Sequence, residues 1–318
     1  MIRTEDLTKD YGTGRGIHGL TLHVPKGTIF GYVGPNGSGK TTTIKMLCGL
    51  ANPTRGTAKI NGLLVNRSNT RKIKSIIGYL PDHFGVYDQM TVWEYLDFFG
   101  AAYKIGTKVR RKRIEEVAEL IEATHMLDYQ VASLSHGMHQ KAGIAKTLLH
   151  DPELLILDEP ANGLDPHARI DMRNTILRLK SIGKTIMLSS HILPELGAIC
   201  DHVAILEKGR LLIHGTVAEI SSKLKENIAL DIVIDGDTEA AAKILKAEKS
   251  IKSVNVSGHE LDVEYTGKRA GVADLNAKLI KEGVRVLSFS EAKVDLENVF
   301  LAVTGKKDGP VVKASDPV

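Results

Sequence analysis

The fold of this chain is decided by the stretch Gly34-Pro35-Asn36-Gly37-Ser38-Gly39-Lys40-Thr41, which fits the pattern G-x-x-x-x-G-K-[ST]. An apolar run over residues 28–33 precedes it and predicts a strand, and apolar residues follow it at helical spacing from Lys40 onward. Glycines let consecutive backbone N–H groups turn toward one anion, while the following helix directs the positive end of its dipole at the same place. The stretch therefore predicts a phosphate-binding loop within an α/β fold.

Each fixed position of this loop has a chemical reason. Lys40 supplies a positive charge for the β- and γ-phosphates of a nucleotide, and the Thr41 hydroxyl is a ligand for Mg²⁺. The backbone from Gly34 to Thr42 is expected to surround the phosphates. The alternative is a plain glycine-rich turn, but the strand before the loop and the helix after it favour nucleotide binding.

A second motif, Leu154-Leu155-Ile156-Leu157-Asp158-Glu159, is an apolar strand that ends in two carboxylates. Asp158 can hold Mg²⁺ directly or through water, and Glu159 can orient and deprotonate an attacking water. An acidic pair after a strand is common, and alone it would favour a solvated strand end. Together with the phosphate loop it predicts a catalytic site for phosphoryl transfer.

A third motif, Leu134-Ser135-His136-Gly137, precedes a predicted helix over residues 138–149. Ser135, Gly137 and the N-terminus of that helix form a second place that suits an anion. One chain with two phosphate sites either wraps a single nucleotide twice or shares each nucleotide with a second copy of itself.

In these motifs and in their order, residues 1 to about 220 resemble the ATP-binding subunits of ABC transporters. Gly34–Thr41 stands where that family has Walker A, Leu134–Gly137 where it has the ABC signature, and Leu154–Glu159 where it has Walker B. Asn162–Asp165 corresponds to the D-loop and His191 to the switch histidine. The resemblance implies a head-to-tail dimer in which each ATP, with Mg²⁺, lies between Walker A of one subunit and the signature of the other.

The resemblance also assigns roles to four side chains. Glu159 is implied to be the general base and His191 to contact the γ-phosphate, although a histidine at the end of a strand is otherwise more often structural. Tyr11 has the position of a ring that stacks on adenine, whereas taken alone it would be a packing residue. Asp165 is expected across the dimer interface, and it can at the same time cap the helix that starts near Pro166.

Two motifs depart from the family pattern. The usual signature is Leu-Ser-Gly-Gly-Gln, and here His136 and Met138 occupy its third and fifth places, a variation that resembles the ABC-2 exporter branch. Asp82 stands where the Q-loop has its glutamine. An ionised carboxylate can contact Mg²⁺ or its water but cannot donate a hydrogen bond, so Asp82 is expected to be a metal contact.

At 318 residues the chain is long enough for two domains. We expect an ABC cassette of the P-loop NTPase type over residues 1–221, in which strands alternate with helices around a mainly parallel sheet. A helical subdomain is expected as an insert at about 86–150. Within it, Thr91 and Glu94 have the spacing of a capping box at the start of a helix.

From about residue 222 the pattern starts afresh. The order β-α-β-β-α-β over residues 222–305, with one more helix over 296–303, predicts a small α+β domain of ferredoxin-like type. Residues 306–318 contain two prolines and are expected to be a disordered tail.

Aromatic side chains are concentrated in the helical insert, at Trp93, Tyr95, Phe98, Phe99 and Tyr103. Most of them are expected to form the insert's own core. In the family, this subdomain and the Q-loop form the groove that receives a short coupling helix of the membrane subunit, so some of the rings are expected to line it.

The insert also carries a basic cluster just before a helix predicted over residues 114–123, namely Lys108, Arg110, Arg111, Lys112 and Arg113. A solvated helix start is favoured, even though positive charge is unfavourable at that end of the helix dipole. Attraction to anionic lipid is the second interpretation, and nucleic acid is the third.

The composition excludes several classes of protein. With 42% hydrophobic and 25% charged residues the chain is an ordinary globular one, and a net charge of +4 predicts no nucleic-acid partner. Cys48 and Cys200 form no CxxC pair and are expected to be small buried hydrophobes in a reducing compartment. No apolar stretch of about 18 residues occurs and the start lacks the core of a signal peptide, so a cytoplasmic location is expected.

Taken together, these observations predict an ATP-hydrolysing subunit of an ABC-2-type transporter, bound at the inner face of the cell membrane to separate membrane-spanning permease subunits. It is expected to act as a homodimer or as a heterodimer with a homologous cassette. Two alternatives stay open: a soluble ABC ATPase of translation or DNA repair, and a regulatory ATP-binding module. The first generally carries two cassettes or a long coiled coil, and the stretch between Lys40 and Asp158 is too short for such an arm. Drug, lipid, ion and polysaccharide remain open as cargo.

Overall fold

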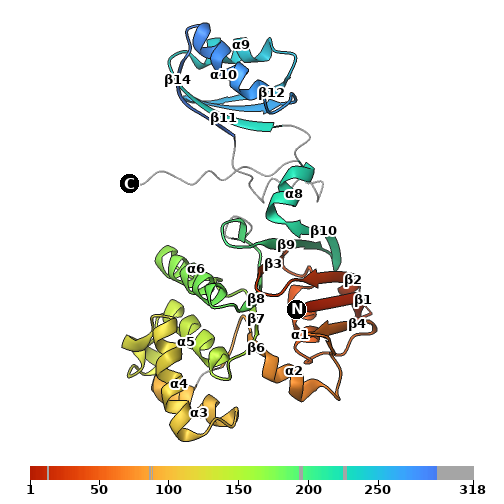
Figure 1. The fold of residues 1–318 in the computed structure, drawn as a ribbon, viewed down its shortest axis with the longest axis vertical. Coiled ribbons are helices and arrows are strands. Elements are labelled where there is room, and N and C mark those ends of the chain that lie inside the picture. Colours follow the sequence, from red (N-terminus) through yellow and green to blue (C-terminus); the bar gives the residue numbers. More distant parts are fainter. Residues whose placement is uncertain (13, 86, 88, 193–195, 225–227, 292–318) are drawn as a thin grey trace. The chain divides into compact units, whose positions relative to one another are not determined.

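The computed structural model describes residues 1–12, 14–85, 87, 89–192, 196–224 and 228–291. The chain separates into two compact units, Met1–Val217 and Ala218–Val318 (Figure 1). All the motifs that predict nucleotide binding lie in the first unit.

The centre of the first unit is a six-stranded sheet with the strand order β10-β9-β3-β8-β7-β6. Its strands are β3 (Ile29–Val33), β6 (Ile77–Leu80), β7 (Leu154–Asp158), β8 (Thr185–Ser190), β9 (His202–Glu207) and β10 (Arg210–Thr216). Neighbouring strands are parallel except β9 and β10, which form an antiparallel hairpin. Every residue of β3, β7 and β8 is buried, as parallel strands covered on both faces require. The carboxyl ends of these three strands, at Val33, Asp158 and Ser190, therefore lie at one edge of the sheet.

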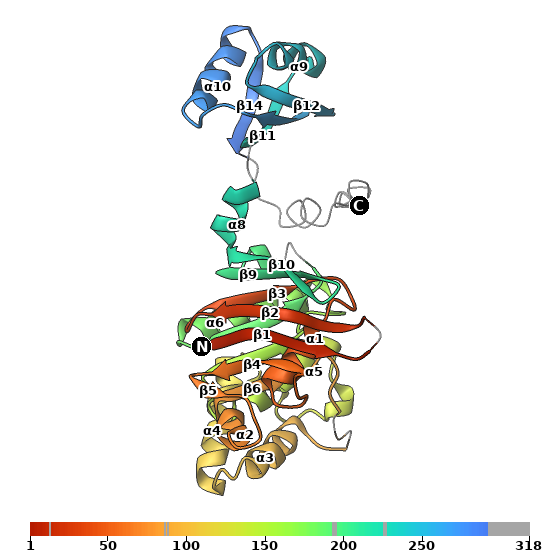
Figure 2. The same cartoon turned by 90° about the vertical axis from the view of Figure 1, so that its right-hand side faces the viewer.

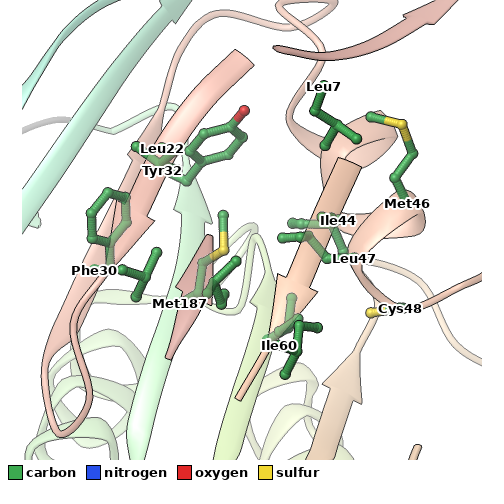
Figure 3. Packing of buried hydrophobic residues seen from close by; sticks show 14 of the residues in the cluster. Leu7, Leu22, Phe30, Tyr32, Ile44, Met46, Leu47, Cys48, Ile60 and Met187 are labelled. Carbon is green, nitrogen blue, oxygen red and sulfur yellow. The ribbon is translucent and has the colours of Figure 1, made fainter. Parts of the chain in front are cut away.

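A second, antiparallel sheet has the order β2-β1-β4-β5 and shares a core with helix α1 (Lys40–Leu47). Its strands are β1 (Ile2–Asp10), β2 (Gly16–Val24), β4 (Arg55–Ile60) and β5 (Leu63–Leu64), and Figure 2 shows β2, β1 and β4 side by side. In Figure 3, Ile44 of α1, Ile60 of β4 and Met187 of β8 gather in one buried cluster. Because both sheets contribute to this cluster, it fixes α1 and with it the loop that precedes α1.

The helical insert begins after helix α2 (Thr70–Ile76) and strand β6. It consists of helices α3 (Val92–Ala102), α4 (Thr107–Leu120) and α5 (His136–Leu148) and the 3-10 turns η1 (Thr124–Met126) and η2 (Val131–Ser133). The capping box predicted at the start of α3 is confirmed: Thr91 Oγ1 accepts from Glu94 N at 3.2 Å, and Glu94 Oε2 accepts from Thr91 N at 2.8 Å. Tyr95 and Leu96 are buried inside the insert, as expected for its core. Helix α6 (Pro166–Ser181) packs beside α5.

The prediction for the basic cluster was wrong about where the helix begins. Helix α4 starts at Thr107, so the cluster lies inside its first turns and does not precede it. Arg110 forms a bidentate pair with Asp97 of α3, at 2.6 and 3.0 Å, which offsets its charge near the helix N-terminus. Arg113 donates to the carbonyl of Leu148 at 3.0 Å, at the C-terminal end of α5, where a cation is favourable. Two of the five basic residues are therefore structural, while Lys108, Arg111 and Lys112 are exposed.

The second unit begins within helix α8 (Val217–Leu224), and its sheet has the order β12-β13-β11-β14. Its elements are β11 (Ile228–Asp235), α9 (Thr238–Lys246), β12 (Ile251–Ser257), β13 (Glu260–Tyr265), α10 (Gly271–Lys281) and β14 (Arg285–Glu291). All pairs of neighbouring strands are antiparallel, and alternate residues of β11 pack under the two helices. The predicted β-α-β-β-α-β order is confirmed. The predicted helix over 296–303 and tail over 306–318 lie outside the described residues.

Both cysteines are buried and unpaired, as predicted, with 7% of Cys48 and 8% of Cys200 exposed. Burial raises the pKa of the Cys48 thiol to about 12 and shifts that of Cys200 in the same direction. Among the described residues, none of the helices combines the length and the apolar character needed to cross a bilayer.

Candidate nucleotide-binding site

The glycine-rich loop connects β3 to α1, and two of its glycines approach their neighbours too closely for a side chain. Gly37 and Gly39 have φ angles of 81° and 101°, in the left-handed region that favours glycine. A Cβ on Gly39 would lie 2.4 Å from Ile17 Cδ1, and one on Gly34 would lie 2.5 Å from the Leu206 carbonyl oxygen. At these glycines no side chain covers the backbone, which faces the inside of the turn next to the N-terminus of α1.

Lys40, the first residue of α1, points back along this loop. It is only 6% exposed, and its Nζ donates to the Gly34 carbonyl oxygen at 2.6 Å. The same Nζ lies 3.2 Å from Glu159 Oε1. The positive charge of the phosphate loop and the carboxylate that follows β7 thus form a buried ion pair.

The two carboxylates after β7 are held by a serine of the neighbouring strand. Asp158 pairs with Ser189 in the register of β7 and β8. Ser189 Oγ donates to Asp158 Oδ1 at 2.6 Å and accepts from the backbone N–H of Glu159 at 3.0 Å. Glu159 itself has a φ of 52°, a left-handed conformation that turns its side chain out of the strand direction.

Burial raises the pKa of Asp158 above its ordinary value. The hydrogen bonds from Ser189 and Thr41 act in the opposite direction, and the charges of Glu159 and Asp82 add to the rise. A carboxylate in this position is stabilised by a cation, because a nearby positive charge favours the ionised form.

His191 follows β8 and completes the polar cluster. Its Nδ1 lies 2.8 Å from Glu159 Oε2, while Lys40 holds the other oxygen of the same carboxylate. Three side chains that were singled out in the sequence, Lys40, Glu159 and His191, are therefore in direct contact, although they come from three different segments.

A pocket of about 560 Å³ opens at this edge of the sheet. It is lined by Tyr11, Arg15, Gly16, Asn36, Gly37, Gly39, Lys40, Thr41, Thr42, Asp82 and Glu159. Most of these residues were predicted for nucleotide or metal contact, but Arg15 and Gly16 were not, because a position before the loop carries no local signal of its own. Tyr11 lines this pocket and is 52% exposed.

The donors in this region fit a nucleotide with a hard cation. The buried Ser38 Oγ has no hydrogen-bond partner among the described residues, as expected of a group that is set aside for a ligand. The Thr41 hydroxyl and the Asp158 carboxylate supply oxygen ligands of the kind that Mg²⁺ prefers.

Ser135 and Gly137 of the signature and Asp165 of the D-loop lie outside the pocket lining, at the N-termini of the adjacent helices α5 and α6. Ser135 caps α5, with its Oγ accepting from Met138 N at 3.3 Å. Asp165 caps α6, as predicted, accepting from Ala168 N at 2.9 Å. Gly137 packs so close to α6 that a Cβ there would lie 2.7 Å from Ala168 Cβ.

Asp82 lines the nucleotide pocket and also has partners outside it. Its Oδ1 accepts from Asn162 Nδ2 at 3.2 Å, and its Oδ2 lies 2.9 Å from His83 Nδ1. His136 Nε2 donates to the backbone carbonyl of Asn162 at 3.0 Å. No local pattern around Asn162 indicates that it joins these two positions.

A second pocket, of about 320 Å³, lies between the sheet and the helical insert. It is lined by Cys48, Leu50, Lys74, Ile77, Tyr79, Pro81, Phe99, Tyr103 and Lys146. Phe99 and Tyr103, two of the rings expected to line a groove, line this pocket, whereas Tyr95 is a core residue.

Lys146 is the unexpected residue of this second pocket. Its Nζ lies 4.6 Å from the ring centroid of Phe84, 5.0 Å from that of Phe99 and 5.9 Å from that of Tyr95. No carboxylate within the described ranges forms an ion pair with it, and burial lowers its pKa to about 8. The aromatic faces compensate only part of the cost of burying this charge.

We expect Lys146→Met to stabilise the first unit at pH 7, by on the order of 1 kcal/mol, because methionine fills the site without a buried charge. The folded pKa of about 8 lies below the ordinary 10.5, so the unfolded chain binds more protons between these values and wild-type stability rises with pH there. The gain from the substitution should therefore shrink by pH 10. Urea denaturation at both pH values measures this, with the exposed Lys45→Met as control; a gain of equal size at the two pH values would contradict it.

Comparison with known proteins identifies the family. The sequence profile of the ABC transporter family matches residues 17–162. The linearmycin resistance ATP-binding protein LnrL of Bacillus subtilis (strain 168) is 32% identical over 311 residues, which cover 96% of this chain and 99% of LnrL. The bacitracin transport ATP-binding protein BcrA of Enterococcus faecalis is 31% identical over 306 residues, which cover 96% of both chains.

Solved structures show the same fold. The structure of cbiO1 from Clostridium perfringens, part of the ABC transporter complex cbiONQ, covers 70% of this chain and 90% of its own, with a TM-score of 0.64 and 25% identity. The resemblance inferred from the ordered motifs is thereby confirmed. This chain belongs to the ATP-binding proteins of ABC transporters.

Proposed function

We propose that this protein hydrolyses ATP to drive export through separate membrane-spanning subunits, as an ABC-2-type ATPase. The observation that carries the proposal is the meeting of the phosphate loop with the carboxylate end of β7, where Lys40 Nζ and Glu159 Oε1 are 3.2 Å apart. Relatives whose names state bacitracin transport and linearmycin resistance support the transport assignment. They favour it over the translation or DNA-repair alternative.

The proposed chemistry is phosphoryl transfer to water. Glu159 orients the water and accepts its proton, because its carboxylate is fixed at the edge of the nucleotide pocket. Lys40 neutralises charge on the β- and γ-phosphates, and His191, held against Glu159, contacts the γ-phosphate. Mg²⁺, when bound by Thr41, Asp158 and Asp82, would neutralise phosphate charge and orient the oxygens.

The backbone and side chains of the loop are proposed to hold the rest of the nucleotide. Residues 34–42 surround the phosphates, and the exposed ring of Tyr11 stacks on adenine. Ser38 donates its hydroxyl to a phosphate oxygen, which would give this buried group its missing partner.

We further propose that two copies, or this chain and a homologous cassette, share each nucleotide. Ser135 and Gly137 do not line the pocket of their own chain, which favours sharing over one chain that wraps a nucleotide twice. In this arrangement Ser135 and Gly137 act on the nucleotide of the other subunit, and Asp165 lies at the interface.

The second pocket is the proposed contact with the permease subunits, at the inner face of the cell membrane. Its apolar and aromatic lining suits the apolar face of a short helix. Closure of the dimer around ATP and its opening after hydrolysis would move this pocket and the helix that it holds.

The test is to look among the neighbouring genes for one that encodes a membrane protein of about six hydrophobic spans, and to co-express that protein with the full chain. The proposal predicts that the chain sediments with membranes only when that protein is present, and that the complex hydrolyses ATP in a Mg²⁺-dependent way. Hydrolysis without recruitment, together with sedimentation on ribosomes or DNA, would overturn the transport assignment.

A further inference from the structure

Two of the three positions at which this chain departs from the family pattern contact the same residue. Asp82, in place of the Q-loop glutamine, accepts from the side-chain amide of Asn162 at 3.2 Å. His136, in the third place of the signature, donates to the backbone carbonyl of Asn162 at 3.0 Å. His136 therefore needs its proton on Nε2, since a carbonyl oxygen can only accept. A glycine at position 136 would have no side chain to make this bond.

The His136 ring packs closely against the turn that contains Asn162. Asn162 N donates to the Glu159 carbonyl at 3.0 Å, so the residue belongs to a tight turn that starts at the proposed base. A Cβ on Gly163, the next residue, would lie 3.4 Å from His136 Nε2. The His136 ring thus lies directly against the turn between β7 and α6.

Phe84, which lies two residues after Asp82, makes a second contact with α5, the helix that Ser135 caps. The ring of Phe84 stacks on His139 of α5, with 4.6 Å between centroids and 12° between planes. A Cβ on Gly143 of the same helix would lie 2.5 Å from Phe84 Cζ, so the ring occupies the space that this glycine leaves open. Asp82 and the N-terminus of α5 are therefore linked through Asn162 on one side and through Phe84 on the other.

We propose that His136 is a positioning residue for hydrolysis, which ties the signature to the D-loop turn and, through Asn162, to Asp82. Asp82 lines the nucleotide pocket of its own chain, whereas Ser135 and Gly137 lie outside that lining and, under the proposed function, act at the site of the other subunit. The link makes the position of the signature depend on the state of the pocket in the same chain. The assignment rests on the proposed function, because it presumes a shared nucleotide.

We expect the effects of substitutions at His136 and Asp82 on turnover to be non-additive, because the two residues are opposite ends of one link. Either His136→Ala or Asp82→Ala breaks the link, so the second loss in the same chain costs little more. The variant Asp82→Asn separates two roles, since an asparagine oxygen still accepts from Asn162 but supplies no carboxylate for a metal. His136→Gln places an amide donor near the position of Nε2 and should restore the contact.

The experiment measures ATP hydrolysis by the purified full chain against ATP concentration, for the wild type, these single variants and the doubles His136→Ala/Asp82→Ala and His136→Ala/Asp82→Asn. We expect His136→Ala to lower kcat about fivefold and to lower the Hill coefficient, with binding of a fluorescent ATP analogue unchanged within about twofold. His136→Gln should recover most of the loss. In the Asp82→Ala background His136→Ala should have little further effect, whereas in the Asp82→Asn background it should cost about the same as in wild type.

An equal loss from His136→Ala in all three backgrounds, or no recovery with glutamine, would overturn the assignment. Hydrogen exchange of the peptide over residues 159–165 provides a readout without turnover, and His136→Ala and Asp82→Ala should each accelerate it by a similar factor. If the wild type hydrolyses no ATP, the proposed function fails, while unchanged exchange in both variants would reject the link itself.

Discussion

Glu159→Gln should reduce ATP turnover by about a hundredfold or more while leaving ATP binding intact, because glutamine keeps the shape of the side chain but cannot accept a proton. The effect should be this large because the carboxylate is buried beside Lys40 and His191, where no solvent-exposed group can replace it. In saturating ATP and Mg²⁺ the variant should also accumulate as a dimer, since the closed state is no longer opened by hydrolysis. Steady-state phosphate release and size-exclusion chromatography with light scattering measure the two outcomes.

The matched control is Glu153→Gln, at the other end of the same strand. Glu153 pairs on the surface with Lys26, at 2.8 Å, and is far from the pocket along β7. It should keep turnover within about twofold of wild type, as surface ion pairs contribute little. Rapid turnover by Glu159→Gln would remove this residue as the base, and a variant that stays monomeric in saturating nucleotide would contradict the two-copy site.

Lys40→Ala should weaken ATP binding by about ten- to a hundredfold, because it removes a buried charge that contacts the β- and γ-phosphates. The loss is enlarged by Glu159, whose carboxylate lies 3.2 Å from Nζ and would then face the triphosphate without a compensating cation. Equilibrium titration with a fluorescent ATP analogue measures the change in Kd.

Lys45→Ala serves as the comparison, since Lys45 is exposed on the same helix α1. It removes the same charge from the same element but not from the pocket, and should leave Kd within about twofold. Equal losses in the two variants would mean that net charge, and not the contact from Lys40, governs affinity.

The parts of the fold that could be predicted from the sequence are those with local signals. A few neighbouring residues are enough to recognise three features: the loop over 34–41, the apolar run of β7 and the capping box at Thr91. The order of elements in the second unit could be predicted for the same reason, from alternation in the strands and spacing in the helices.

The error at α4 has a physical cause that lies outside the helix. Apolar periodicity first becomes clear at Ile114, and five basic residues before it appear unfavourable near a helix N-terminus. The structure places Asp97 of α3 against Arg110 and the carboxyl end of α5 against Arg113. Partners that are distant in the sequence thus offset the unfavourable effect of basic residues near the N-terminus of α4. The sequence of α4 alone does not reveal these partners.

In the candidate site, too, some residues can be predicted from local motifs, while other contacts depend on packing between distant segments. Lys40, Asp158 and Glu159 stand in motifs, whereas the bridge through Ser189 depends on the register of β7 against β8. Register between strands about 30 residues apart is set by packing, and no pattern within either strand states it. Lys146 was overlooked for a similar reason, because its three aromatic neighbours come from two other segments.

The burial of both native thiols has a practical consequence for studying the dimer. Thiol reagents attack the thiolate, and Cys48 and Cys200 are only 7% and 8% exposed and are held protonated at neutral pH. A cysteine introduced on the surface would therefore take up a maleimide dye or a spin label selectively, without first removing the two native ones. Distances measured between such labels on two paired copies can thus follow the approach and separation of the subunits, in a sequence that is otherwise unaltered.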